Sequence, residues 1–217
     1  MSTTTAQRKR TGWRLVGYLA RRATMLEIRG YQSIFRFVFR RPRVPAGSVG
    51  FTYHQPVFAI LIVFVVVSAI ELVVVDLIVR PWPQIRIPLL ILGIWGLVFM
   101  LGMLFGMLTR PHAVGPAGIR VRSGPEVDIA LPWADIESVA PRKRVIQEKQ
   151  PKVIVDDSGK ATLHLRMQNE TNLEVKLGQP VTVRLPQGSE TVSQVNLYAD
   201  DPKAFVAEVR RHHESAT

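Results

Sequence analysis

The stretch VFAILIVFVVVSAIELVVVDLIV at residues 57–79 decides the fold, because only Ser68, Glu71 and Asp76 interrupt an apolar run of 23 residues. A second stretch, IPLLILGIWGLVFMLGMLFGML at residues 87–108, has 22 residues and no charge. An α-helix rises about 1.5 Å per residue, so either stretch is long enough to cross the roughly 30 Å hydrocarbon core of a bilayer. The two stretches therefore predict a pair of transmembrane helices.

The predicted transmembrane hairpin, residues 56–110, turns between Arg80 and Arg86, where two prolines stop the first helix and Trp82 suits the headgroup level. The first apolar run is too long for the core of a secretory signal peptide and starts more than fifty residues along the chain. Eleven Lys and Arg residues precede this run, whereas the turn holds two. The positive-inside rule then predicts a two-span protein of the cytoplasmic (inner) membrane with both termini in the cytoplasm.

Charge is distributed unevenly along the 217 residues, which include 28 Lys+Arg and 17 Asp+Glu. Residues 1–55 hold 11 basic residues and one acidic residue, whereas residues 113–217 hold 14 of each. The basic excess therefore belongs to the N-terminal quarter, and no nucleic-acid-binding motif accompanies it, so we predict no nucleic-acid partner. The chain has no cysteine, which excludes disulfides, thiolate nucleophiles and cysteine-ligated metals.

The N-terminal quarter is predicted to be a disordered basic tail at residues 1–11 followed by a basic amphipathic arm at residues 12–55. Arginines recur at seven-residue intervals with bulky apolar residues between them, which is typical of one or two amphipathic helices, divided in the second case at Gly30, in the interface of an anionic leaflet. The predicted lipid contacts are Trp13, Arg14, Arg21, Arg22, Arg29, Arg36, Arg40 and Arg41. The alternative is a basic helix that packs against the chain's own C-terminal domain.

Two acidic residues interrupt the first predicted span, and each is a candidate contact with an intramembrane partner, because a carboxylate in hydrocarbon is costly unless it is protonated or paired. Asp76 precedes Arg80 by four residues, so an i,i+4 ion pair explains it without a function. Glu71 has no such local partner. It is either a neutral structural residue, a contact with another membrane subunit, or part of a proton or cation path.

The second predicted span contains several glycines. Gly102 and Gly106 form a G-x-x-x-G pattern, and Gly93 and Gly96 add a further patch of small residues. Such spacing lets two helices approach closely. The glycines are therefore predicted to pack either against the first span or against a second copy of the chain.

The C-terminal third changes to a period of two, which indicates β-strands separated by turn residues. The predicted strands are residues 119–122, 127–129, 136–139, 162–167, 173–177, 181–185 and 192–198. Asp200-Asp201-Pro202 then signals the start of a final helix whose apolar stripe is Phe205, Val206 and Val209. Trp133 is predicted to cover the core and Asp135 to serve a turn or a helix cap.

Seven strands closed by one C-terminal helix resemble the bacterial pleckstrin-homology-like (PH-like) domain. The resemblance lies in GIRV at residues 118–121, LPWADIESV at residues 131–139 and the segment from Val195 to Val209. With the preceding hairpin, residues 50–212 resemble small actinobacterial membrane proteins with two spans. This resemblance implies a cytoplasmic PH-like domain at residues 113–213, with a scaffold or interaction role.

One basic cluster interrupts the otherwise neutral C-terminal domain, and its members are Arg142, Lys143, Arg144, Lys149 and Lys152. We expect it in a loop between the third and fourth strands. There it would contact an acidic partner or a lipid headgroup, or would simply be solvated.

Catalytic and metal-binding motifs are missing from the sequence, which has no nucleophile elbow, P-loop, dinucleotide fingerprint or zinc-protease motif. His54 and His112 flank the two spans, but interfacial histidines are favoured over a metal-ligand pair. The predicted α+β membrane protein is therefore a non-catalytic adaptor or accessory subunit, without cofactor, metal or small-molecule substrate. Its expected partners are anionic lipids and a membrane protein or a second copy; the alternative function is an anionic-lipid-sensing module.

Overall fold

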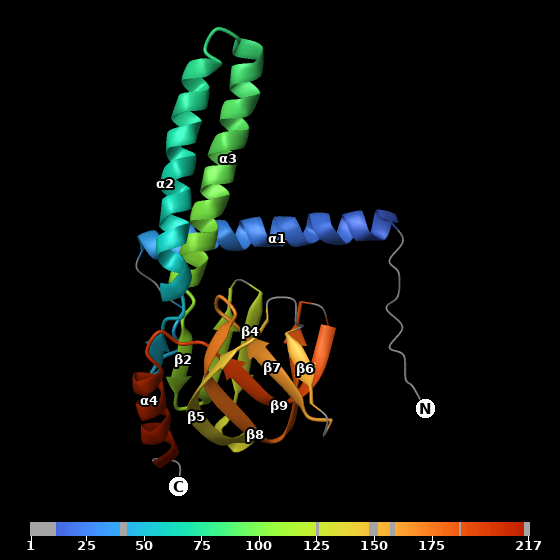
Figure 1. The fold of residues 1–217 in the computed structure, drawn as a ribbon, viewed down its shortest axis with the longest axis vertical. Coiled ribbons are helices and arrows are strands. Elements are labelled where there is room, and N and C mark those ends of the chain that lie inside the picture. Colours follow the sequence, from blue (N-terminus) through green and yellow to red (C-terminus); the bar gives the residue numbers. More distant parts are fainter. Residues whose placement is uncertain are drawn as a thin grey trace.

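The computed structural model describes residues 12–39, 43–124, 126–147, 152–156, 159–186 and 188–214. The chain is an α+β protein with three parts: a long hairpin of two helices, one helix across the base of that hairpin, and a β domain below (Figure 1). The predicted tail at residues 1–11 lies outside the described residues, as do Arg40, Arg41 and Lys149.

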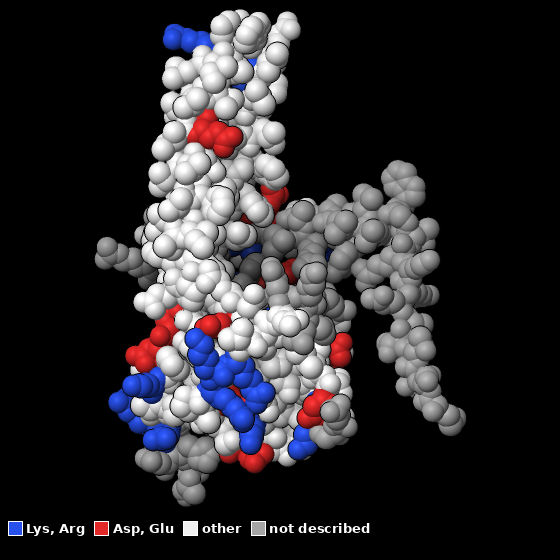
Figure 2. Space-filling model, in the orientation of Figure 1, with Lys and Arg blue, Asp and Glu red and all other residues white. Residues whose placement is uncertain are grey.

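The predicted hairpin consists of helices α2 (Gln55–Ile78) and α3 (Pro83–Leu108). Each helix has a proline in its first turn, where the missing N–H costs no helical hydrogen bond. Both helices are long and apolar enough to cross a membrane, and few of their residues are buried by the rest of the chain. That exposure separates them from the core helices of soluble proteins. Figure 2 shows the hairpin as a white column with few charged side chains.

Helix α1 (Gly12–Val38) runs across the base of the hairpin, at a steep angle to α2 and α3 (Figure 1). The arm predicted as one or two helices is thus a single helix that continues through Gly30. The predicted boundary at residue 55 is wrong, because strand β1 (Val49–Phe51) pairs with β2 (His112–Gly115) and so belongs to the β domain. A three-residue strand carries no detectable alternation, so only its distant partner reveals it.

The β domain contains two sheets in the described part of the chain. The first has the order β1-β2-β3-β4, with β3 at Gly118–Ser123 and β4 at Val127–Leu131. The second has the order β5-β8-β9-β7-β6. Its strands are β5 (Ile136–Val145), β6 (Val153–Val155), β7 (Ala161–Leu165), β8 (Glu170–Leu185) and β9 (Gly188–Leu197). A short 3-10 helix (Trp133–Asp135) connects the sheets.

The described part of the chain contains nine strands, whereas the sequence predicted seven. Residues 173–177 and 181–185, expected as two strands, form the single strand β8, whose pairing with β9 shifts register between Lys176 and Val181. The short strands β1, β2 and β6 were not predicted as strands. Strands β7 and β9 run parallel, so the second sheet is not purely antiparallel.

One apolar core joins the two sheets and helix α4 (Pro202–Glu214). Phe205 is fully buried in it, and its ring centroid lies 5.0 Å from that of Phe51 in β1. The expected helix start is confirmed, because Asp201 accepts a hydrogen bond from the backbone N–H of Ala204 at 2.9 Å. Trp133 packs against the core as predicted and donates its indole N–H to the Gly115 carbonyl at 3.1 Å.

The hairpin is joined to the β domain at both ends of its base. Strand β1 leads directly into α2, α3 leads into β2, and β1 and β2 pair with each other. Asp200 also connects the β domain to the start of α2. Its backbone N–H donates to the Thr52 carbonyl at 2.8 Å, and its carboxylate accepts a hydrogen bond from the Gln55 backbone N–H at 3.1 Å. The β domain is therefore held in a defined orientation to the hairpin.

Candidate functional site

The crossing of α1 and α3 is built from glycine. Gly30 of α1 lies against Gly102 of α3, so closely that a Cβ atom on Gly102 would stand 2.9 Å from the Gly30 Cα atom. One turn further along α3, Gly106 faces Ser33, and Phe37 stacks on Phe105 with centroids 4.1 Å apart. The G-x-x-x-G pattern therefore receives α1, and the prediction that it packs against the first span or a second copy is wrong for Gly102 and Gly106.

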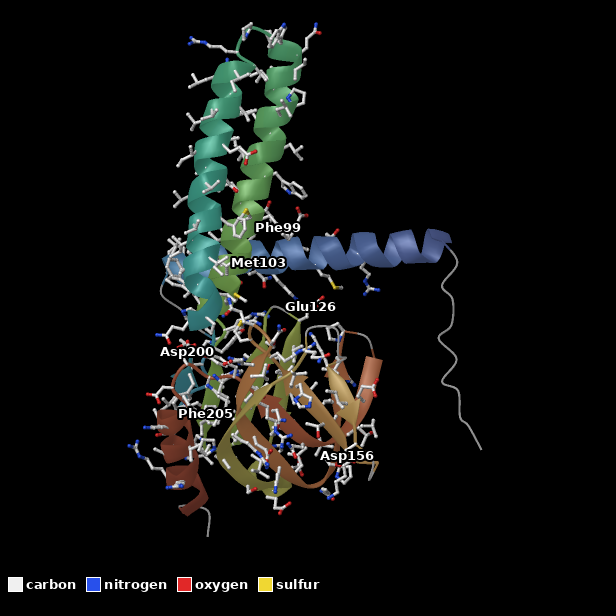
Figure 3. The ribbon with its side chains drawn as sticks, in the orientation of Figure 1. Phe99, Met103, Glu126, Asp156, Asp200 and Phe205 are labelled. Carbon is white, nitrogen blue, oxygen red and sulfur yellow. The ribbon has the colours of Figure 1, made fainter. Side chains whose placement is uncertain are left out.

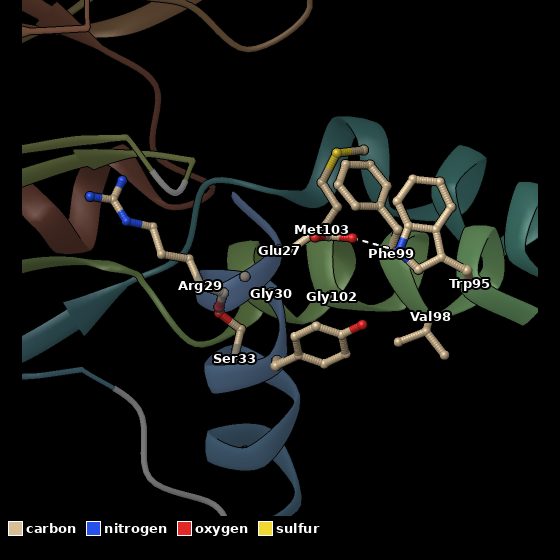
Figure 4. A pocket seen from close by; sticks show the side chains of 11 residues that line it. Glu27, Arg29, Gly30, Ser33, Trp95, Val98, Phe99, Gly102 and Met103 are labelled. Atoms are coloured by element: carbon tan, nitrogen blue, oxygen red, sulfur yellow. Dashed lines mark hydrogen bonds between the residues drawn. The ribbon is translucent and has the colours of Figure 1, made fainter. Parts of the chain in front are cut away.

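A hydrogen bond reinforces this crossing, since the Trp95 indole of α3 donates to the Glu27 carboxylate of α1 (Figure 4). Glu27 is the single acidic residue among the first 55 residues, which hold 11 basic ones. The arginine spacing does not predict a role for Glu27. The signal in the sequence is that Glu27 is a single carboxylate within a basic arm.

Two opposite faces of α1 have different chemistry. Tyr31, Phe35 and Val38 share one face at i, i+4 and i+7, and 52%, 60% and 67% of these residues are exposed. Arg29 and Arg36 lie on the opposite face, about 200° around the helix from Tyr31 and Val38 respectively. In Figure 4, Arg29 points away from α3 toward the strands of the β domain. The helix thus presents an uncovered apolar face and an arginine face.

The arginine face borders the β domain rather than open solvent. Arg21 and Arg29 line a groove whose opposite wall is formed by Glu126 and Arg184, at the end of the β domain that faces α1 (Figure 3). Trp13, Arg14 and Arg22 also belong to α1. The packing partner of α1 is α3, so the alternative that α1 packs mainly on the C-terminal domain is not what the structure shows.

Arg122 of β3 is the buried link between the segment after α1, the end of the hairpin and the β domain. Only 4% of its side chain is exposed. Its guanidinium donates to the Arg43 carbonyl, to the Pro111 carbonyl at 3.1 Å and to Asp128 at 3.3 Å. Arg120 binds the same carboxylate at 2.6 Å, but 45% of its side chain is exposed.

Arg122→Gln should therefore lower the free energy of unfolding by about 2 kcal/mol, because the change leaves two buried carbonyls without a donor. Arg120→Gln, which removes an exposed bond to the same Asp128, should cost less than about 1 kcal/mol. Denaturant unfolding of the two full-length variants in detergent micelles would measure both. Equal losses would contradict the role assigned to the buried guanidinium.

The two acidic residues of α2 have different surroundings. Asp76 accepts two hydrogen bonds from Arg86, at 2.6 and 2.9 Å, so the predicted pairing with Arg80 is wrong. Arg86 stands on the facing helix, a neighbour that spacing along one helix does not reveal. Within the described part of the chain, Glu71 has no hydrogen-bond or ion-pair partner.

Glu71 lines a groove of about 450 Å³ between α2 and α3, together with Ser68, Gly93, Gly96 and Met100. Gly93 is covered by Leu72 of α2, as predicted for a glycine that seats the first span. Nothing lies within 4 Å of the position that a Cβ atom on Gly96 would occupy. The groove therefore combines an exposed carboxylate with an open glycine surface.

The basic cluster of the β domain is mostly paired. Arg142, Lys143 and Arg144 lie on strand β5, so their predicted placement in a loop is wrong. Arg144 binds the buried Glu174 at 2.8 Å, with Arg142 beside it at 3.5 Å, and Lys143 contacts Glu170 at 3.0 Å. Lys152 directly precedes β6. Figure 2 shows basic side chains gathered on one side of this domain.

The two histidines predicted at the ends of the spans lie in different environments. His54 precedes the first turn of α2, whereas His112 belongs to β2 and is almost fully buried in the β domain, so its predicted interfacial placement is wrong. Among the described residues, no three His, Asp or Glu side chains gather as metal ligands.

No protein-family model, curated protein or solved structure matches this chain. The geometry defines its class: an α+β protein with two helices long and apolar enough to cross a membrane, a transverse helix at their base and a two-sheet β domain.

Proposed function

We propose that this protein is a non-catalytic accessory subunit or adaptor of the cytoplasmic membrane, anchored by α2 and α3, which presents a PH-like β domain to the cytoplasm. Both chain termini would lie on the cytoplasmic side, in keeping with the eleven basic residues before the first span. Two sheets, one core and a C-terminal helix support the PH-like assignment of the β domain.

The position of α1 supports the membrane placement. The twenty residues of α3 from Pro83 to Gly102 rise about 30 Å, which is the thickness of the hydrocarbon core. If the turn at Pro83 lies at one surface of the bilayer, α1 lies at the other. There its apolar face enters the lipid and its arginine face stays in the headgroup layer.

Glu71 is the observation that carries the subunit role. A carboxylate at this depth is costly without a partner, and the described part of the chain supplies none. The open groove beside it admits another transmembrane helix, because Gly96 lets a neighbouring backbone approach. The expected partner helix carries a basic or hydrogen-bond-donating side chain opposite Glu71.

Glu71→Gln should weaken the association with this partner about tenfold, since it removes the charge while keeping the size of the side chain. The measurement is co-purification of tagged full-length protein from native membranes in mild detergent. Asp76→Asn is the matched control, because its carboxylate is already paired with Arg86 inside the hairpin. The partner should remain bound to this control at the wild-type ratio.

A protein that purifies alone, and behaves identically with Gln at position 71, would rule out the subunit role. A partner lost equally from both variants would show that any change of charge in α2 disrupts the complex, and that Glu71 makes no specific contact.

A further inference from the structure

Another groove lies where the apolar and arginine faces of α1 meet. Its walls are Tyr31, Gln32, Phe35 and Arg36 of α1, together with Arg43 from the segment that follows this helix. Its volume is about 500 Å³, within the range of small-molecule sites. One wall is therefore aromatic, and the other carries two guanidinium groups.

Further arginines surround this groove from the hairpin base and the β domain. Burial and the neighbouring Arg36 and Arg122 lower the pKa of Arg43. Burial, followed by Arg43 and Arg29, lowers the pKa of Arg110 to about 10. Burial is the largest cause of both shifts, and the arginines that follow it show that several guanidinium groups gather here, beside the single carboxylate of Asp128. Such a group of arginines favours an anion.

The groove also lies at a particular depth. It is formed by α1, which crosses α3 about 30 Å from the turn at Pro83. Phe35 and Tyr31 continue the exposed apolar face of the helix, while Arg36 begins the opposite one. A ligand that fits must be apolar on one side and anionic on the other, which describes a phospholipid.

We propose that this groove binds an anionic phospholipid of the leaflet in which α1 lies, with its phosphate between Arg36 and Arg43 and its glycerol and upper acyl chains against Phe35 and Tyr31. Guanidinium groups are suited to phosphate because they donate two parallel hydrogen bonds. The inference rests on the proposed membrane placement. It adds a specific lipid site to the general attraction of a basic helix to a membrane.

The test uses the full-length protein in a zwitterionic detergent, titrated with phosphatidylglycerol or with phosphatidylcholine of the same chain length, and bound lipids are counted by native mass spectrometry. The wild type should retain one phosphatidylglycerol in preference to phosphatidylcholine. Arg36→Gln/Arg43→Gln should bind it at least about tenfold more weakly, because two charge-assisted contacts are lost. The matched control is Arg210→Gln/Arg211→Gln, which removes two positive charges from α4 and should bind normally.

Several results would overturn the site. These are equal losses in both double variants, no loss in Arg36→Gln/Arg43→Gln, or equal binding of the two lipids by the wild type. Competition by inorganic phosphate at the lipid concentration would identify a soluble phosphate as the ligand instead. If the double variant does not fold, Arg36→Gln alone should still weaken binding severalfold, and unchanged binding would refute the site.

Carbonate extraction of membranes separates this inference from the proposed function. All variants should remain in the membrane fraction, because α2 and α3 are unchanged. Loss of lipid binding with retention in the membrane is the expected pattern. Release of the wild type by carbonate would refute the membrane anchor itself.

Discussion

Gly102→Leu is expected to release α1 from the hairpin. A Cβ atom at this position would lie 2.9 Å from the Cα atom and 3.2 Å from the carbonyl carbon of Gly30, and a backbone cannot swing aside as a flexible side chain can. Overpacking of this kind costs about 1–3 kcal/mol in a packed core. Because the two backbones meet at Gly30 and Gly102, we expect this cost to separate the helices.

The release of α1 from α3 can be measured by disulfide cross-linking between an introduced pair of cysteines, because the chain contains no native cysteine. A Cβ atom on Gly106 would lie 3.7 Å from the Ser33 Oγ atom, so cysteine side chains at these two positions would be in contact. Ser33→Cys/Gly106→Cys should therefore form a cross-link in the otherwise wild-type chain and lose most of it when Gly102→Leu is added.

Gly96→Leu is the matched control for this experiment, since the same substitution on the same helix meets nothing within 4 Å. Its cross-linking yield should equal that of the parent. If Gly102→Leu cross-links as efficiently as the control, α1 does not depend on this glycine for its position.

Acidification is expected to destabilise the β domain through His112. The Nε2 atom of His112 lies 2.9 Å from the Tyr198 carbonyl oxygen, and its Nδ1 atom accepts the backbone N–H of Arg122 at 3.0 Å. These two bonds require the neutral ring, with its proton on Nε2. Burial lowers the pKa of His112 to about 4, and the positive charge of Arg122 adds to this effect.

The direction of the pH effect on stability depends on whether the folded or the unfolded protein binds the proton more readily. In the unfolded chain His112 takes up a proton below its ordinary pKa of 6.5, whereas in the folded protein it stays neutral down to about pH 4. Its contribution to stability is therefore intact above pH 6.5 and is lost as the pH falls toward 4. The loss reaches roughly 3 kcal/mol, and His164, whose pKa burial also lowers to about 4, adds to it.

Denaturant unfolding of the full-length protein between about pH 7.5 and about pH 3.5 would test this, because that range brackets the unfolded and the folded pKa values of the histidines. His112→Gln should be less stable at neutral pH but lose less stability on acidification. Identical pH profiles for the wild type and His112→Gln would contradict the assignment.

The Gly102 and His112 substitutions both affect the connection between the α2–α3 hairpin and the β domain. Gly102 sets the transverse position of α1, while His112 and Arg122 join the end of the hairpin to β3 and to the chain before α4. A subunit that presents a binding surface at a fixed height above a bilayer requires such a connection. A flexible tether would leave the orientation of the surface undefined.

Local patterns of residues were enough to predict several elements of the fold. The apolar runs predicted α2 and α3, the seven-residue arginine spacing predicted the two-faced helix α1, and Asp201 with Pro202 predicted the start of α4. These signals can be read because each depends on residues within a few turns of one another. Most of the longer strands were predicted for the same reason, from alternation along a short segment.

Only the three-dimensional structure shows which helix and strand surfaces contact one another. Spacing places Gly102 and Gly106 on one face of α3, but it does not say that α1 covers that face. It likewise does not show that Asp76 reaches Arg86 on the facing helix, or that Arg36 and Arg43 line one groove. Periodicity defines a face, whereas the identity of its neighbour depends on long-range contacts, which a local pattern does not encode.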